Sequence, residues 1–126
     1  MRAYTVATVA VALRVPPKWL DNLLTNHTVP GVSKRRQGIA RRLTPEAVTV
    51  LEIVLRLTRS LGLPVARALI VARDHSASPY REEGIALTVD ASAVRADVEA
   101  RLAEAVELTP TPTRGRPRRR RVKADG

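Results

Sequence analysis

The sequence contains no cysteine and no phenylalanine, and only one tryptophan and two histidines among its 126 residues. The absence of cysteine excludes a disulfide framework, a thiolate zinc site and a thiol nucleophile. No apolar run reaches the ~18 residues of a membrane-spanning helix. The apolar stretch between Arg2 and Ala12 is too short for a secretory signal, which needs ~15–30 residues. Apolar residues still make up 44% of the chain, so we expect a cytoplasmic protein with one hydrophobic core.

Residues that could support enzyme chemistry are few and poorly placed. His27 and His75 lie far apart in the sequence, and neither has partners at metal-ligand spacing. Asp74 and His75 are adjacent in a polar segment, where neighbouring charges are usually solvated. Gly38 and Gly62 stand alone and form no phosphate-binding loop. We therefore expect no catalytic residue, no metal ion and no cofactor.

The net charge of +10 is unevenly distributed along the chain. Residues 1–43 carry eight basic residues against one acidic residue, and residues 109–126 carry seven against one. Residues 44–108 carry seven basic residues against ten acidic residues. A polyanion would therefore contact both ends of the chain, and nucleic acid is the obvious polyanion. An acidic membrane surface would require a basic amphipathic helix or a lipid anchor, and the sequence shows neither, so we expect no membrane partner.

The N-terminal residues have the pattern of two short helices joined by a turn. Residues 5–13 are rich in β-branched side chains, but their apolar residues fall at i, i+3, i+4 and i+7, which favours a helix. Thr5 is placed to cap this helix, and Pro16-Pro17 suits the first turn of a second helix over residues 16–25. The apolar stripe of the second helix consists of Trp19, Leu20, Leu23 and Leu24. Two such helices with a short connection form a helix-turn-helix.

A hairpin and two further helices are predicted next. Residues 28–43 combine a Pro-Gly turn with a basic polar tip and a return strand over residues 39–43. Thr44, followed by proline and an acid, is a strong helix start, and Gly62 is a suitable C-cap. Pro64 opens another helix that ends near residue 72.

The C-terminal part is expected to contain a loop, a short strand, one helix and a disordered tail. Residues 73–84 are polar and predict a loop, whereas residues 85–89 predict a strand. Asp90 or Ser92 caps a final helix that reaches about residue 108. The apolar face of this helix consists of Val94, Val98, Leu102 and either Ala105 or Val106. Residues 109–126 have almost nothing to bury, which predicts disorder.

Several short motifs follow one another in a characteristic order within residues 4–72. They are Tyr4-Thr5-Val6, Val9-Ala10, Val15, Leu20, Gly38-Ile39-Ala40-Arg41-Arg42-Leu43, Thr44-Pro45-Glu46-Ala47-Val48 and Leu61-Gly62-Leu63-Pro64-Val65. In this order and spacing the segment resembles the winged helix-turn-helix of MerR-type regulators and their excisionase-like relatives. The resemblance implies a mainly α fold with four parts: a winged helix-turn-helix domain (1–72), a linker loop (73–84), a strand-helix element (85–108) and a basic tail (109–126).

The resemblance also implies that the second helix lies in the major groove of DNA and that a basic wing follows the flanking backbone. The outward residues of the second helix are Lys18, Asp21, Asn22 and Thr25. The basic residues of the wing are Lys34, Arg35, Arg36, Arg41 and Arg42, and Arg14 at the turn is a further candidate for the DNA backbone. Asn22 can pair bidentately with adenine, and Lys18 can donate to guanine or to a phosphate. The alternative is that both groups are simply solvated.

Asp21 departs from the family pattern, in which a basic residue is usual at this position. An acid here repels phosphate, accepts from a cytosine amino group, or forms an ion pair with Lys18 three residues earlier. Pro16-Pro17 likewise replaces the usual capping serine or threonine. Trp19 is expected at the edge of the core rather than stacked on a base.

The C-terminal tail contains Arg114-Gly115-Arg116-Pro117 followed by four arginines. This segment resembles the core of an AT-hook, in which extended chain with flanking arginines lies in a narrow minor groove, where the potential is most negative. A generic polybasic arm is the alternative. Either form would raise affinity without adding much sequence information.

Residues 85–108 allow two arrangements. They can form a homodimer, with strand 85–89 pairing across the axis, or they can complete the core of the monomer. Dimers of DNA-binding proteins read palindromic half-sites, and the homodimer is the arrangement we expect.

Together these features predict sequence-specific binding of double-stranded DNA by a small transcriptional regulator. No effector domain follows the winged helix, so no small-molecule effector is expected. One alternative is a nucleoid-associated or excisionase-like protein that bends DNA. Another is a protein-interaction module that reads no DNA, which would show no steep salt dependence of binding.

Overall fold

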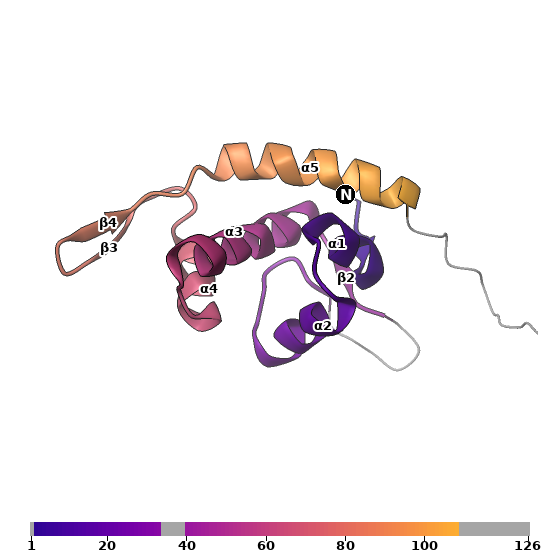
Figure 1. The fold of residues 1–126 in the computed structure, drawn as a ribbon, viewed down its shortest axis with the longest axis horizontal. Coiled ribbons are helices and arrows are strands. Elements are labelled where there is room, and N and C mark those ends of the chain that lie inside the picture. Colours follow the sequence, from indigo (N-terminus) through magenta and orange to yellow (C-terminus); the bar gives the residue numbers. More distant parts are fainter. Residues whose placement is uncertain (1, 34–39, 109–126) are drawn as a thin grey trace, which may run out of the picture.

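The computed structural model describes residues 2–33 and 40–108. This part of the chain is mainly α, as predicted (Figure 1). Its helices are α1 (Val6–Leu13), α2 (Pro17–Asn26), α3 (Pro45–Leu61), α4 (Val65–Asp74) and α5 (Ala91–Leu108). Its strands are β1 (Tyr4–Thr5), β2 (Arg42–Leu43), β3 (Tyr80–Glu82) and β4 (Ile85–Leu87). Within the described ranges, no helix combines the length and apolar character needed to cross a membrane.

The central helix α3 packs against both α4 and α5. Its limits follow the predicted cap residues. The hydroxyl of Thr44 accepts a hydrogen bond from the backbone N–H of Ala47 at 3.2 Å, and Pro45 occupies the first turn. Gly62 ends the helix in the left-handed conformation, with φ of 69°, which costs glycine little. Figure 1 shows α5 lying across α3 and α1, with α2 on the opposite side of the molecule.

A small antiparallel arrangement holds the start of α1 to the start of α3. Thr5 caps α1 as predicted, accepting from the backbone N–H of Thr8 at 3.1 Å. The local pattern predicts Tyr4 and Thr5 only at the opening of this helix, but they also form β1, in which Tyr4 lies opposite Leu43. Leu43 is fully buried and forms a second bridge with Val32. The predicted hairpin therefore brings Val32 beside the return strand, and in the described residues that strand is limited to Arg42–Leu43.

The segment between α4 and α5 differs from the prediction. The expected loop over residues 73–84 contains strand β3, which pairs antiparallel with β4. The predicted strand 85–89 therefore ends at Leu87, and its partner lies in the same chain. The two strands are joined by Glu83 and Gly84, with φ of 47° and 81°. Positive φ at both central residues is the signature of a type I′ turn. The hairpin projects from one end of the molecule (Figure 1).

Helix α5 completes the core of the monomer. Asp90 caps it, accepting a hydrogen bond from the backbone N–H of Ala93 at 3.1 Å. The predicted apolar face is buried against α1 and α3 and consists of Val94, Val98, Leu102 and Ala105. Because this face is covered within the chain, the apolar stripe of α5 is not available to a second copy.

A carboxylate lies buried where α1, α3 and α5 meet. Glu52 of α3 is 3% exposed. Arg101 of α5 donates to both its carboxylate oxygens, at 3.1 and 3.3 Å, and also to the backbone carbonyl of Ala12 at 3.2 Å. Arg56 donates to the same carboxylate at 2.8 Å. This charge network fixes α5 to α1 and α3.

Candidate nucleic-acid interface

Helices α1 and α2 are joined by residues 14–16, in agreement with the short connection that the sequence predicts. Arg14 ends α1 in the left-handed conformation, with φ of 60°, and the backbone N–H of Val15 donates to the carbonyl of Ala10 at 3.0 Å. Pro16 is extended, and Pro17 begins α2, where a missing N–H removes no helical hydrogen bond. The connection therefore turns the chain sharply without a side-chain cap on α2.

The two faces of α2 have opposite environments. Leu20, Leu23 and Leu24 are buried in the core. Trp19 is half-buried at the edge of the core, as predicted. The opposite face of α2 is polar, and its hydrophilic side chains point away from the core along the length of the helix.

Lys18 and Asn22 lie four residues apart on this outer face, and both are exposed. Neither side chain makes a hydrogen bond or an ion pair with the part of the chain that the structure describes. Residues four apart on a helix are neighbours on its surface. The ammonium of Lys18 and the amide of Asn22 are therefore adjacent hydrogen-bonding groups on the outer face of α2 that no described residue occupies.

The structure places Arg41, Asp21 and Thr25 in one network. Arg41 forms an ion pair with the Asp21 carboxylate at 3.0 Å, and it also donates to the Asp21 carbonyl at 3.3 Å and to the Thr25 hydroxyl at 3.1 Å. The Thr25 hydroxyl in turn donates to the Asp21 carbonyl at 2.9 Å. The Arg41 side chain is only 12% exposed.

This network corrects two expectations. Asp21 does not pair with Lys18, because its partner is Arg41. Arg41 is not a free phosphate-binding side chain, because its guanidinium donates to the Asp21 carboxylate and the Thr25 hydroxyl of α2. Asp21, Thr25 and Arg41, all predicted to face DNA, thus also connect α2 to the base of the predicted wing.

The other predicted basic residues fall into two groups. Arg14 and Arg42 are exposed, and the backbone N–H of Arg42 donates to the Ser33 hydroxyl at 2.8 Å, which holds the two sides of the hairpin base together. The remaining candidates lie outside the described residues, and these are Lys34, Arg35, Arg36, Arg114 and Arg116.

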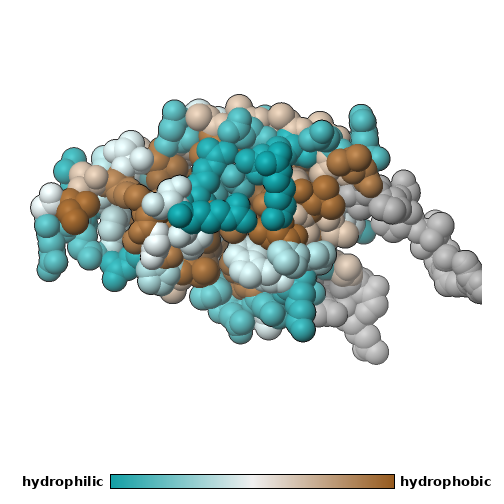
Figure 2. Space-filling model, viewed as in Figure 1, coloured by the Kyte–Doolittle hydropathy of each residue, from teal (hydrophilic) through white to brown (hydrophobic). Residues whose placement is uncertain are grey.

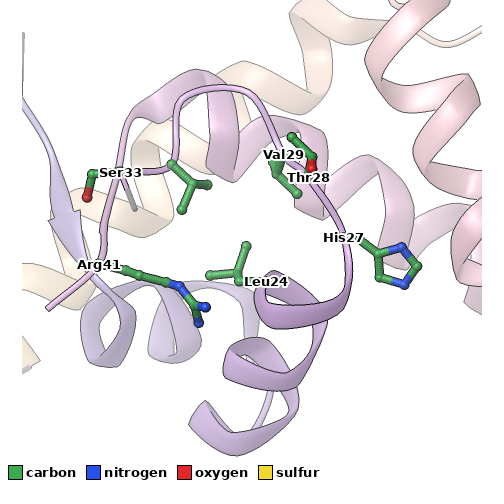
Figure 3. Close-up of a pocket in the computed structure, with 7 residues that line it drawn as sticks. Leu24, His27, Thr28, Val29, Ser33 and Arg41 are labelled. Atoms are coloured by element: carbon green, nitrogen blue, oxygen red, sulfur yellow. The ribbon is translucent and has the colours of Figure 1, made fainter. Parts of the chain in front are cut away.

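A pocket of about 370 Å³ separates the end of α2 from the chain that follows it (Figure 3). It is lined by Leu24, His27, Thr28, Val29, Val32, Ser33 and Arg41. In Figure 3, Arg41 extends toward α2 beside Leu24, whereas His27 lies at the rim. Arg73 of α4 donates to the Thr28 carbonyl at 3.2 Å. Arg73 thus ties the start of the chain leading into the wing to α4, and Arg41 ties its return to α2.

The sequence did not predict the ion pair between Arg41 and Asp21 or the hydrogen bond from Arg73 to Thr28, although it held one sign of the ion pair. Asp21 is the one acid among the first 43 residues. An isolated acid among many bases is a natural ion-pair partner, but the sequence does not say which base it meets. Nothing in the sequence indicated the contact from Arg73.

No family model, curated protein or solved structure matches this chain. Among the residues that the structure describes, no group of three or more histidine, cysteine or acidic side chains could hold a metal ion.

Proposed function

We propose that this chain binds double-stranded DNA as a winged helix-turn-helix protein, with α2 in the major groove. The observation that carries the proposal is the exposed pair Lys18 and Asn22, whose side chains have no partner among the described residues, on a helix whose other face is anchored by buried leucines. A helix held rigidly from behind can present its outer residues to base edges in a fixed orientation.

Each residue has a distinct role in this proposal. Asn22 pairs bidentately with an adenine, whose N6 and N7 match the donor and acceptor of the amide. Lys18 donates to guanine or to a neighbouring phosphate. Arg14 and Arg42, both exposed, contact the phosphate backbone. Arg41 acts through α2, because it bonds Asp21 and Thr25 and so holds the helix against the chain that leads into β2.

The basic wing and the Arg-rich tail contribute phosphate and minor-groove contacts that raise affinity for all sequences. The biological role that fits a small protein of this kind is transcriptional regulation in the cytoplasm, by association with the nucleoid. A DNA-bending role would use the same surface with less reading of bases.

The proposal is tested by the salt dependence of binding to a random-sequence duplex, followed by fluorescence anisotropy. Each phosphate neutralised adds about 0.9 to the slope of log K against log salt. Lys18→Ala should therefore lower the slope by roughly one. The matched control is Arg81→Ala, an exposed arginine on β3 without a side-chain partner among the described residues.

The control variant should bind like the unaltered protein. Loss of slope in both variants would mean that net charge, rather than α2, determines binding. Absence of salt-dependent binding in the unaltered chain would instead favour a protein-interaction module.

A further inference from the structure

The β3–β4 hairpin has one edge that carries no charge. Within the described residues, β4 has β3 as its one strand neighbour, so its outer edge is open. From Ile85 to Val89 this edge contains no charged residue and no proline. The outer edge of β3 carries Arg81 and Glu82 instead. Natural sheets protect open edges with charges or proline, and here the β4 edge lacks that protection.

The turn determines which backbone groups face outward. A type I′ turn closes with a hydrogen-bonded pair, here Glu82 and Ile85. Pairs alternate along an antiparallel ladder, so Arg81 and Ala86 form the next, non-hydrogen-bonded pair. The N–H and C=O groups of Ala86 therefore point away from β3, and those of Thr88 follow the same alternation.

The side chains beside this edge are apolar and poorly covered. Ile85 is 68% exposed, and Ala86 is also exposed. Leu87 and Val89 are half-buried against the core. In Figure 2, brown atoms reach the surface at the end of the molecule where Figure 1 shows the hairpin. An isolated two-stranded hairpin is marginally stable in water, and three or more strands stabilise it.

We propose that a second copy of this chain pairs with β4, so that the two hairpins form one four-stranded antiparallel sheet across a two-fold axis. Centring the axis at Leu87 places Ala86 of one copy opposite Thr88 of the other, which satisfies the outward backbone groups of both residues. The same register places Ile85 of one copy opposite Val89 of the other, on the face that Leu87 shares. The exposed isoleucine is thereby covered by an apolar side chain.

The distribution of charge favours a second copy over another basic or acidic partner. The chain carries a net charge of +10, and two copies repel one another if their basic surfaces meet. Residues 80–90 carry Arg81 against Glu82, Glu83 and Asp90, so the hairpin end is slightly acidic. In Figure 1 this end lies away from α2. Pairing through β4 thus brings together the least basic ends, with uncharged strands in contact.

The experiment measures the mass of the full-length chain by light scattering over a concentration series from about 1 to 100 μM, without DNA. We expect twice the monomer mass at the upper concentrations. Ala86→Pro removes an outward N–H without removing a hydrogen bond to β3, and it should give a monomer throughout. The matched control is Arg81→Pro, which makes the same change on the outer edge of β3 and should leave the dimer intact.

A second variant tests the edge without altering the backbone. Ile85→Lys introduces a charge at the exposed position and should also give a monomer, with an unchanged circular dichroism spectrum. A monomeric unaltered chain at all concentrations would overturn the proposal. So would a dimer that persists in Ala86→Pro, or one that Arg81→Pro disrupts equally. Because no DNA is present, these outcomes are independent of the proposed DNA binding.

Discussion

Replacing Glu52 with glutamine removes the negative charge on which Arg101 and Arg56 converge. Breaking a fully buried ion pair costs about 3–5 kcal/mol, chiefly because the remaining charge is left without a partner. Here the Arg101 side chain is 25% exposed and the Arg56 side chain is 40% exposed. Arg56 also keeps its ion pair with Asp97 at 2.9 Å. Both cations can regain water, so we expect a smaller loss, about 2 kcal/mol.

Thermal unfolding followed by circular dichroism measures this loss. For a domain of this size, about 2 kcal/mol corresponds to a decrease in Tm of roughly 8–10 °C. The matched control is Glu99→Gln, since Glu99 is an exposed acid that pairs with Arg95 within the same helix. Exposed pairs contribute ~0–1 kcal/mol, so the control should change Tm by only a few degrees.

A double variant distinguishes the cost of leaving Arg101 without its carboxylate from the cost of lost packing around Glu52. Glu52→Leu together with Arg101→Leu leaves no buried carboxylate and should recover most of the stability lost in Glu52→Gln. Equal effects of Glu52→Gln and Glu99→Gln would refute the reasoning that the Glu52 network fixes α5 to the core.

Three further perturbations follow from the structure. Arg41→Ala should weaken DNA binding at least several-fold while leaving the salt slope nearly unchanged, because its guanidinium contacts α2 rather than phosphate; in the anisotropy titration, a loss of about one unit of slope would show that it contacts DNA directly. Leu20→Ala should cost about 2–5 kcal/mol in chemical denaturation, because Leu20 is fully buried; a cost under about 1 kcal/mol would mean that α2 is not anchored to the core. The backbone N–H at the start of α3 and then the Arg95 guanidinium hold the pKa of Glu46 below its usual value of 4.5. The stabilisation by ionised Glu46 is therefore fully present above pH 4.5 and is lost as the pH falls through the lower folded-state pKa. Glu46→Gln should be less stable than the unaltered chain at pH 7 but equal to it in acid. A stability difference that grows in acid would contradict this assignment.

Local signals allowed the helices to be predicted. Thr44 and Gly62 bound α3 as expected, and Asp90 caps α5, because caps act within one turn of the residues they bond. The same reasoning failed for β1. Tyr4 joins a strand only because Leu43, far along the chain, lies beside it, and no local pattern reports such a contact.

The apolar stripe of α5 illustrates a different limit. Val94, Val98 and Leu102 predicted a buried face, and that prediction is confirmed. The stripe does not indicate whether a second chain or the same chain covers it, because either surface removes the same apolar area from water. Strand β3 was missed for a different reason: its three residues, Tyr80–Glu82, are too few to show a period.

The candidate site was predicted residue by residue, but the contacts among its residues were not. Lys18 and Asn22 are exposed as expected. The sequence could not distinguish an arginine that contacts phosphate from one that forms an ion pair with Asp21, since both require the same side chain near a negative charge. To identify Asp21 as the partner of Arg41, one must know that the return strand of the hairpin lies against α2.

The central claim is that α2 reads base sequence, and selection from a random pool of duplexes tests it most directly. The unaltered full-length chain should enrich a reproducible motif that contains an adenine contacted by Asn22. Asn22→Ala should lose about 1–3 kcal/mol of preference at that one base pair and keep the rest of the motif, whereas Arg81→Ala should select the complete motif. Failure of the unaltered chain to enrich any motif, or enrichment of the same motif at equal strength by Asn22→Ala, would contradict the claim.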